Sequence, residues 1–183
     1  MNKKCDYFVI ESKNCNHFVK IVRKNTKNNS NIMSIKIIEE DEDENEIENI
    51  SIDFLQGEYC FFSEKIFNIL KINNIYGIKF VETKWIKSQE HINKQFWCLL
   101  ENNTIDNMVA ENYEYDIIWS ISPYEHYEIN MEFLKNIPLQ EKLIFMIGDI
   151  PRHFVFHKTI VNLIMKAKPK GIEFIPIENN EEI

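Results

Sequence analysis

Residues 61–83 of the chain read FFSEKIFNILKINNIYGIKFVET, and residues 155–177 read VFHKTIVNLIMKAKPKGIEFIPI. The two stretches align without a gap at a constant offset of 94 positions, as from Gly77 to Gly171. Six aligned pairs are identical: Phe62 and Phe156, Ile66 and Ile160, Asn68 and Asn162, Gly77 and Gly171, Ile78 and Ile172, Phe80 and Phe174. The repeat predicts one unit used twice, in which a helix, a short turn and a strand follow one another. The alternative is a chance similarity between two amphipathic helix–strand pairs.

The first unit shows how each part of the pattern is specified. Ser63 is a residue type that caps helices, and the apolar positions after it have helical spacing. They are Ile66, Phe67, Ile69 and Leu70, with Ile72 as a candidate last member. The pair Asn73-Asn74 ends the helix, and residues 75–81, which contain Gly77, are predicted to form a strand.

Short apolar or alternating runs elsewhere predict further strands. We expect them at 5–11, 17–23, 33–38, 50–54, 95–101, 115–121 and 143–147, while 123–136 fits a helix or a strand equally well. The chain of 183 residues has the length of one domain. We therefore predict a single α+β domain over 1–183, with a mostly antiparallel sheet and the two related helix–strand units at 61–83 and 155–177.

Composition places the chain among ordinary globular proteins. Hydrophobic residues make up 44% and charged residues 27%. The four cysteines are scattered without a CxxC pair, as expected for reduced thiols. No stretch approaches the ~20 apolar residues that span a bilayer, and the basic start of the chain lacks the apolar stretch of a signal peptide. We expect a cytoplasmic protein with no membrane partner.

The formal net charge of −8 equals the charge of one segment, because residues 39–48 read EEDEDENEIE and hold eight acids. This acidic loop, with Asp41, Glu42, Asp43, Glu44 and Glu46, is a candidate surface for a basic partner, with carboxylates in place of phosphates. The alternative is a solvated loop without a partner. The basic residues of 1–38 are interrupted by predicted strands and followed by these acids, so we expect no nucleic-acid partner.

Aromatic residues suggest a second candidate surface. Trp and Tyr are enriched at the energetic centres of interfaces. We assign Trp97 and Trp119 to the core, and we select as partner-binding candidates Trp85, Tyr113, Tyr115, Tyr124 and Tyr127.

Candidate catalytic or metal-binding groups are sparse. His153 and His157 have a spacing that would share a metal on a helix, but the stretch RHFVFH favours a strand end running into a helix start. The four glycines are isolated, which excludes a Gly-rich phosphate loop. We expect no enzyme activity, no metal and no cofactor. The alternative is a small-molecule-binding domain or enzyme with a site at His153, His157 and Glu125.

The stretch LIFMIGDIPRHFVFHKTIVNLIMKAKPKGIEFIPI, from Leu143 to Ile177, resembles the carboxy-terminal signature of α+β immunity proteins of bacterial polymorphic toxin systems. The segment CFFSEKIFNILKINNIYGIKFVE resembles the same family's helix–strand unit, and the resemblance covers roughly residues 58–177. The first fifty residues, including the acidic loop, match nothing in that pattern. The resemblance implies a cytoplasmic immunity protein that binds and neutralises a cognate toxin. A basic nuclease-like toxin would suit the acidic loop. A third hypothesis is a structural partner protein without an inhibitory role.

Overall fold

The computed structural model describes residues 6–12, 18–23, 33–38, 52–56, 59–86, 91–101, 103–106, 131–148 and 154–177. For residues 18–23, 33–38, 56, 84–86, 91–94 and 100–101 it describes the strands without their side chains. The elements are β1 (Tyr7–Ser12), β2 (Phe18–Arg23), β3 (Met33–Ile38), β4 (Phe54–Gln56), β5 (Cys60–Ser63), α1 (Glu64–Ile72), β6 (Lys79–Ile86), β7 (His91–Glu101), β8 (Asn103–Ile105), α2 (Met131–Lys135), the 3-10 helix η2 (Leu139–Lys142), β9 (Ile144–Ile147), β10 (Phe154–His157), α3 (Lys158–Lys166) and β11 (Ile172–Pro176).

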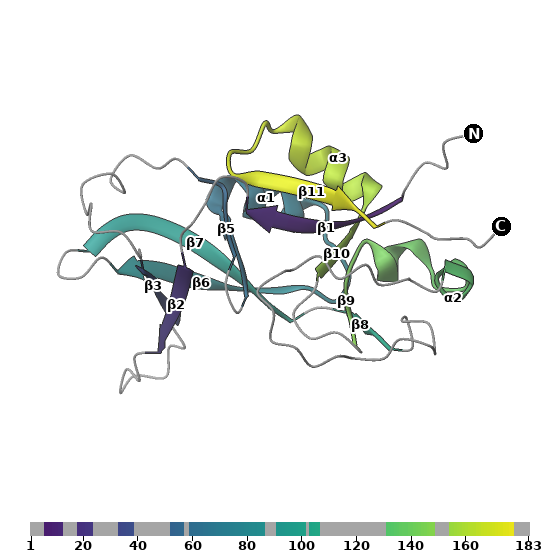
Figure 1. Ribbon diagram of the computed structural model, residues 1–183, viewed down its shortest axis with the longest axis horizontal. Helices are drawn as coiled ribbons and strands as arrows, with labels where there is room; N and C mark the ends of the chain where they lie inside the picture. Colours follow the sequence, from purple (N-terminus) through teal and green to yellow (C-terminus); the bar gives the residue numbers. More distant parts are fainter. Residues whose placement is uncertain are drawn as a thin grey trace.

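The strands form two sheets (Figure 1). One has the order β11-β1-β10-β9-β8 and the other the order β2-β3-β6-β7-β5-β4. The pairs β3–β6 and β8–β9 are parallel, and the other described pairs are antiparallel. The predicted α+β fold with mostly antiparallel pairing is confirmed, with two sheets in place of one.

Helices α1 and α3 bury the same positions of the repeated pattern. Helix α1 buries Ile66, Phe67 and Leu70, and α3 buries Ile160, Val161 and Ile164. This spacing places each set on one face, which packs on the sheets. Ile72 is 82% exposed, so its candidate place on the buried face was wrong. The helix ends there, and its last side chain turns to solvent.

The turns after the two helices also match. Asn74 and Gly77 have φ angles of 45° and 73°, and their aligned partners Lys168 and Gly171 have 50° and 72°. A left-handed conformation ends the helix and reverses the chain in each case. The strand predicted for 75–81 therefore begins later, at Lys79, because Gly77 belongs to the turn.

A third strand completes each unit in the same register. Strand β7 lies between β5 and β6 and places Trp97 opposite Phe62 and Leu99 opposite Phe80. Strand β1 lies between β10 and β11 and places Phe8 opposite Phe156 and Ile10 opposite Phe174. Strand β1, near the start of the chain, is thus the middle strand of the second unit, as β7 is of the first. The similarity between the two helix–strand pairs extends to their sheets.

The outer neighbours β4 and β9 extend the match. Phe54 lies opposite Phe62, and Ile144 lies opposite Phe156, so these two residues hold equivalent positions. Each unit therefore comprises four strands and one helix. Helices α1 and α3 contact each other on one side of the molecule (Figure 1). One core cluster contains apolar side chains from both units.

Other predictions differ from the structure mainly at element ends. The strands predicted at 5–11, 17–23 and 95–101 are β1, β2 and β7, and the strand at 33–38 is β3 with the predicted bounds. The strand predicted for 50–54 begins only at Phe54, and that for 143–147 begins at Ile144. Part of the undecided segment 123–136 is the helix α2. The strand predicted for 115–121 lies outside the described residues.

Candidate functional site

The partner-binding residues selected from the sequence lie mostly outside the described residues. These are Asp41, Glu42, Asp43, Glu44, Glu46, Tyr113, Tyr115, Tyr124 and Tyr127. Trp85 lies in β6, where it is opposite Ile35 of the parallel strand β3, and its side chain is not described. Both surfaces therefore remain predictions.

His157 belongs to the local structure of helix α3. As predicted for RHFVFH, the strand β10 runs into α3, with His157 at the junction. Its Nδ1 atom accepts a hydrogen bond from the Thr159 N–H at 3.3 Å and lies 3.0 Å from the Thr159 hydroxyl. The imidazole is 7% exposed and meets the Tyr7 ring edge-on at 5.3 Å. His157 thus caps the helix, and His153 and Glu125 lie outside the described residues.

Burial lowers the pKa of His157 below its usual value of 6.5. The nearby charge of Asp6 acts to raise it, and those of Lys158 and Lys142 act to lower it further. The neutral ring, which can accept the Thr159 N–H, is therefore the stable form in the folded chain.

Other potentially reactive groups are held in their protonated forms. Burial raises the pKa of Cys98 to about 12, and burial together with Cys98 raises that of Cys60 far above its usual value. Burial and the charge of Asp6 raise the pKa of Tyr7 to about 12. A reactive cysteine needs a lowered pKa and access to solvent. These groups are therefore structural. Among the described residues, no three His, Cys, Asp or Glu side chains are placed to share a metal ion.

Among the hydrogen bonds of the described residues, the carboxylate of Asp53, just before β4, accepts several. Its Oδ1 accepts the Ser63 hydroxyl at 2.7 Å, and its Oδ2 accepts the Lys170 N–H at 2.8 Å and the Lys65 ammonium at 3.1 Å. The Asp53 N–H donates to the Lys170 carbonyl oxygen at 2.9 Å. Lys65 also donates to the Lys168 carbonyl oxygen at 3.3 Å. We call this group the Asp53 clamp.

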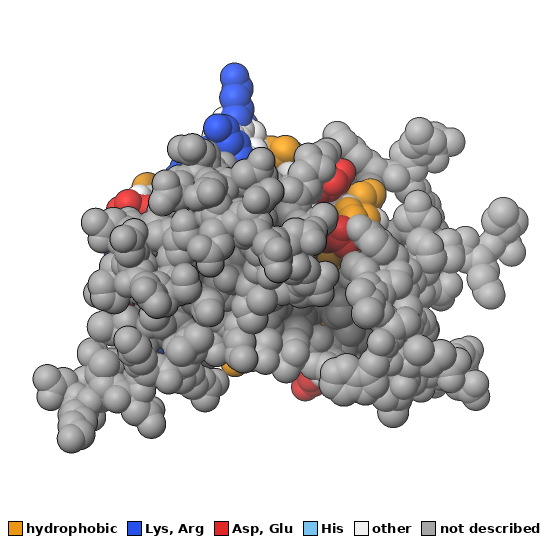
Figure 2. Space-filling model, turned by 60° about the vertical axis from the view of Figure 1, so that its left-hand side comes forward, with side chains coloured by type: hydrophobic (Ala, Val, Ile, Leu, Met, Phe, Trp, Pro, Cys, Tyr) orange, Lys and Arg blue, Asp and Glu red, His pale blue; other side chains and the backbone are white. Residues whose placement is uncertain are grey.

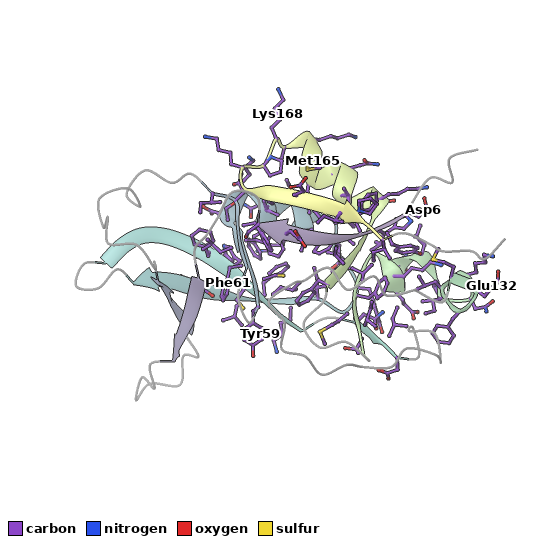
Figure 3. All side chains as sticks on the ribbon, viewed as in Figure 1. Asp6, Tyr59, Phe61, Glu132, Met165 and Lys168 are labelled. Atoms are coloured by element: carbon purple, nitrogen blue, oxygen red, sulfur yellow. The ribbon has the colours of Figure 1, made fainter. Side chains whose placement is uncertain are left out.

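The clamp joins the two units, because Asp53 and Ser63 belong to the first and the 168–170 turn to the second. Figure 3 shows Lys168 at the turn, projecting away from the sheets. Burial acts to raise the pKa of Asp53, but the hydrogen bonds from Ser63, Lys170 and Lys65 outweigh it and hold the pKa below its usual value of 3.8. The carboxylate is thus charged in the folded chain.

A hollow of about 650 Å³ lies on the first unit's own helix–strand turn. It is lined by Asn73, Asn74, Ile75, Tyr76, Gly77, Ile78, Gln140 and Leu143. Asn103 of β8 braces its two walls, since its side-chain amide donates to the Glu141 carbonyl oxygen and its Cβ lies against Gly77. We call it the 73–78 hollow.

Three large apolar side chains that line the 73–78 hollow, or are next in sequence to residues that line it, are exposed, and we call them the apolar rim. Tyr76, which lines the hollow, is 57% exposed. Ile72 and Leu139, each next in sequence to a lining residue, are 82% and 50% exposed. Hydrophobic side chains also lie beside acidic ones on the face that Figure 2 shows. An apolar rim around a partly polar hollow is typical of a binding site.

Comparisons with known proteins assign no family: no family model matches the chain, and no curated protein matches it. Within the described ranges, no helix is long and apolar enough to cross a membrane.

Neither the clamp nor the 73–78 hollow was foreseen from the sequence. The sequence pattern predicts Asp53 in the interior of one strand and Tyr76 in another. The signal that could have placed Tyr76 in an exposed turn is Gly77 itself, a residue type that favours a positive φ after the pair Asn73-Asn74.

Proposed function

We propose that the protein is a cytoplasmic immunity protein, which binds a cognate bacterial toxin and neutralises it by protein–protein contact. The observation that carries the binding function is the exposed apolar rim of the 73–78 hollow, formed by Ile72, Tyr76 and Leu139. Large apolar side chains that remain exposed together on a folded chain mark interaction surfaces. The choice of a toxin as partner rests on the resemblance of the repeated unit to immunity proteins.

Two properties of the described chain support binding over catalysis. The thiols of Cys60 and Cys98 and the imidazole of His157 are buried and serve packing or capping. Tyr76, by contrast, is exposed to solvent, so its ring can be buried against a partner. Aromatic anchors of this kind carry much of the affinity of protein interfaces.

The acidic loop adds a reason for a basic toxin. Asp41, Glu42, Asp43 and Glu44 would raise the association rate with a basic surface through long-range attraction. The affinity would then come from a buried area of about 1,600 Å², the usual size of a stable interface.

The test is growth of cells that express the gene next to this one, with and without this chain. We expect that gene product to be toxic and the chain to restore growth. A matched variant, Tyr76→Ser with Leu139→Ser, should fold normally and protect less. The proposal fails if the neighbouring product is harmless, or if it remains toxic when the chain is present.

A further inference from the structure

The two contacts between the units are related by the duplication. In the first unit, the Ser63 N–H donates to the Asp53 carbonyl oxygen at 3.0 Å; in the second, the His157 N–H donates to that of Leu143 at 2.9 Å. Leu143 therefore stands where Asp53 stands in the other half. Across from each residue lies the other unit's helix–strand turn, with Lys170 facing Asp53 and its aligned partner Tyr76 facing Leu143.

At the first contact the turn is closed by a carboxylate. Asp53 accepts the Lys170 N–H with its side chain and donates its own N–H to the Lys170 carbonyl oxygen. The pair leaves the Asp53 side chain only 13% exposed.

At the second contact the same turn is open. Asn74 and Gly77 hold the φ angles of Lys168 and Gly171, so the two turns have the same backbone form. Among the described residues, no bond between Leu143 and Tyr76 matches the Asp53 N–H bond to the Lys170 carbonyl oxygen. Leu143 has no side-chain acceptor to offer. Within the part of the chain that the structure describes, no hydrogen bond joins the Tyr76 N–H. The 73–78 hollow is lined by Tyr76 and Leu143, the residues equivalent to Lys170 and Asp53.

We propose that the 73–78 hollow binds an acidic segment of another polypeptide, whose Asp or Glu carboxylate accepts the Tyr76 N–H as Asp53 accepts that of Lys170. The site belongs to the chain itself and does not depend on the partner being a toxin.

The dimensions and surroundings favour a polypeptide over a free carboxylate. The volume of about 650 Å³ lies within the ~300–1,000 Å³ of ligand pockets, whereas a water-sized group fills about 30 Å³. The exposed side chains of Ile72 and Leu139 offer apolar contacts that a small anion would not use. Lys71 and Lys142 are next in sequence to this part of the chain, but their ammonium groups lie over the Phe67 ring and on the Leu134 carbonyl oxygen, so the preference for an anion rests on the Tyr76 N–H.

The 73–78 hollow has fewer hydrogen-bond donors for a carboxylate than the Asp53 clamp has. Thr159 is aligned with Lys65, so the second contact lacks the ammonium that binds Asp53. The carboxylate would be held by neutral donors, and the apolar rim must supply a large part of the affinity.

The test uses the purified full chain and a phage-displayed library of random heptapeptides. The library is depleted on the variant Leu143→Asp, which places a carboxylate at the position equivalent to Asp53 as a competitor for the Tyr76 N–H. We expect the remaining binders to share an Asp or Glu next to an apolar residue. In an amide spectrum, a selected peptide should shift the Tyr76 signal, and replacing its acid by the matching amide should weaken binding about tenfold.

Two substitutions at one position separate the donor from the ring. Tyr76→Pro removes the N–H and should abolish the preference for the acidic peptide over its amide form. Tyr76→Ala keeps the N–H, so it should weaken both peptides and retain the preference. Leu143→Asn, a neutral variant of equal size, controls for the loss of the leucine, and thermal unfolding verifies that each variant folds. If Tyr76→Pro does not fold, Leu143→Asp alone decides.

Three results would overturn the proposal: no enriched peptide, enriched peptides without an acid, or acidic peptides that bind Leu143→Asp as well as the parent chain. Binding of N-acetyl-aspartate as tight as that of the peptide would overturn the polypeptide as occupant. None of these results involves the neighbouring gene product, so failure here is distinct from failure of the immunity function.

Discussion

The carbonyl oxygens of Asp53 and Leu143 accept equivalent backbone hydrogen bonds, one in each half of the molecule. The donors are the N–H groups of Ser63 and His157, the residues that precede the two main helices. The main chain is thus duplicated at this point while the side chains differ. One half uses a carboxylate to hold the opposite turn, and the other leaves a hollow there.

Asp53→Asn should destabilise the chain at neutral pH. The substitution removes the charge that accepts hydrogen bonds from Ser63, Lys65 and Lys170, and bonds to charged groups contribute ~1.5–3 kcal/mol. Chemical denaturation at pH 7 measures the free energy of unfolding. Lys65→Met is the control, and it should cost under about 1 kcal/mol because the Lys65 side chain is 43% exposed and its ion pair is screened by solvent.

The cost of Asp53→Asn should depend on pH in a definite direction. The pKa of Asp53 is lowered in the folded chain, so its stabilisation is fully present above the unfolded value of 3.8. It is lost as the pH falls through the folded pKa, which lies below 3.8. The parent and the variant should therefore converge in stability below that pH. A difference that stays constant down to strong acid contradicts the role of the carboxylate.

His157→Ser should lower the stability of the chain. The substitution places at the start of α3 the residue type that Ser63 provides at the start of α1. Serine can cap the helix, but the packing of the imidazole against Tyr7 is lost, for a cost of about 1–3 kcal/mol. The measurement is thermal unfolding near pH 7.5.

The parent chain should also lose stability in mild acid through His157. Its pKa is lowered on folding, so the stabilisation is present above 6.5 and is lost as the pH falls through the folded value. His157→Ser should lack this component. Equal slopes of stability against pH from 7.5 to 5 would refute it.

Gly77→Ala should cost more than Gly171→Ala. Both glycines have φ near 70°, where an alanine is strained by ~1–2 kcal/mol. At Gly77 an added Cβ would also lie 3.0 Å from Asn103 Cβ and 3.1 Å from the Asn103 backbone nitrogen. Urea denaturation of both variants provides the comparison. A fully tolerated Gly77→Ala would mean that the turn is not held against β8.

Ile66→Ala and Ile160→Ala should destabilise the chain by similar amounts, about 2–5 kcal/mol each. The two side chains are 0% and 1% exposed, and they hold aligned positions in one core cluster. Ile72→Ala, at an 82% exposed position, is the matched control and should change stability little. Two separate unfolding transitions, or a large effect at one position only, would show that the units are not equivalent parts of one core.

Replacing Asp41, Glu42, Asp43 and Glu44 by Ser should slow association with a basic toxin and flatten its dependence on salt. Exposed charges act over a Debye length of about 8 Å at physiological ionic strength, so they mainly change the association rate. Stopped-flow mixing at several salt concentrations measures it. The thermal unfolding of the variant should stay unchanged, and an unaltered rate at low salt argues against charge mimicry.

The repeated unit could be predicted from the sequence because its determinants are local. The spacing of Ile66, Phe67 and Leu70 and the glycine before each strand act within about twenty residues, and the alignment reproduces both helices. The strand that completes the second unit, β1, is far from it along the chain. A short alternating run such as YFVIES predicts a strand but does not indicate which strands will pair with it.

The candidate site depends on contacts between distant segments, and for that reason it was missed. Asp53 meets Lys170 only because the two units pack together, and the 73–78 hollow is lined by residues as far apart in sequence as Tyr76 and Leu143. No local sequence pattern indicates either the Asp53–Lys170 contact or the 73–78 hollow.

We propose that this chain is a binding protein that uses the face around the 73–78 hollow. The most direct measurement is light scattering during size-exclusion chromatography of the purified chain mixed with the product of the neighbouring gene. We predict a one-to-one complex that survives the column, and at least tenfold weaker binding for Tyr76→Ala, as expected of an aromatic anchor. Two separate peaks at micromolar concentrations, or a complex unaffected by changes at Ile72, Tyr76 and Leu139, would contradict it.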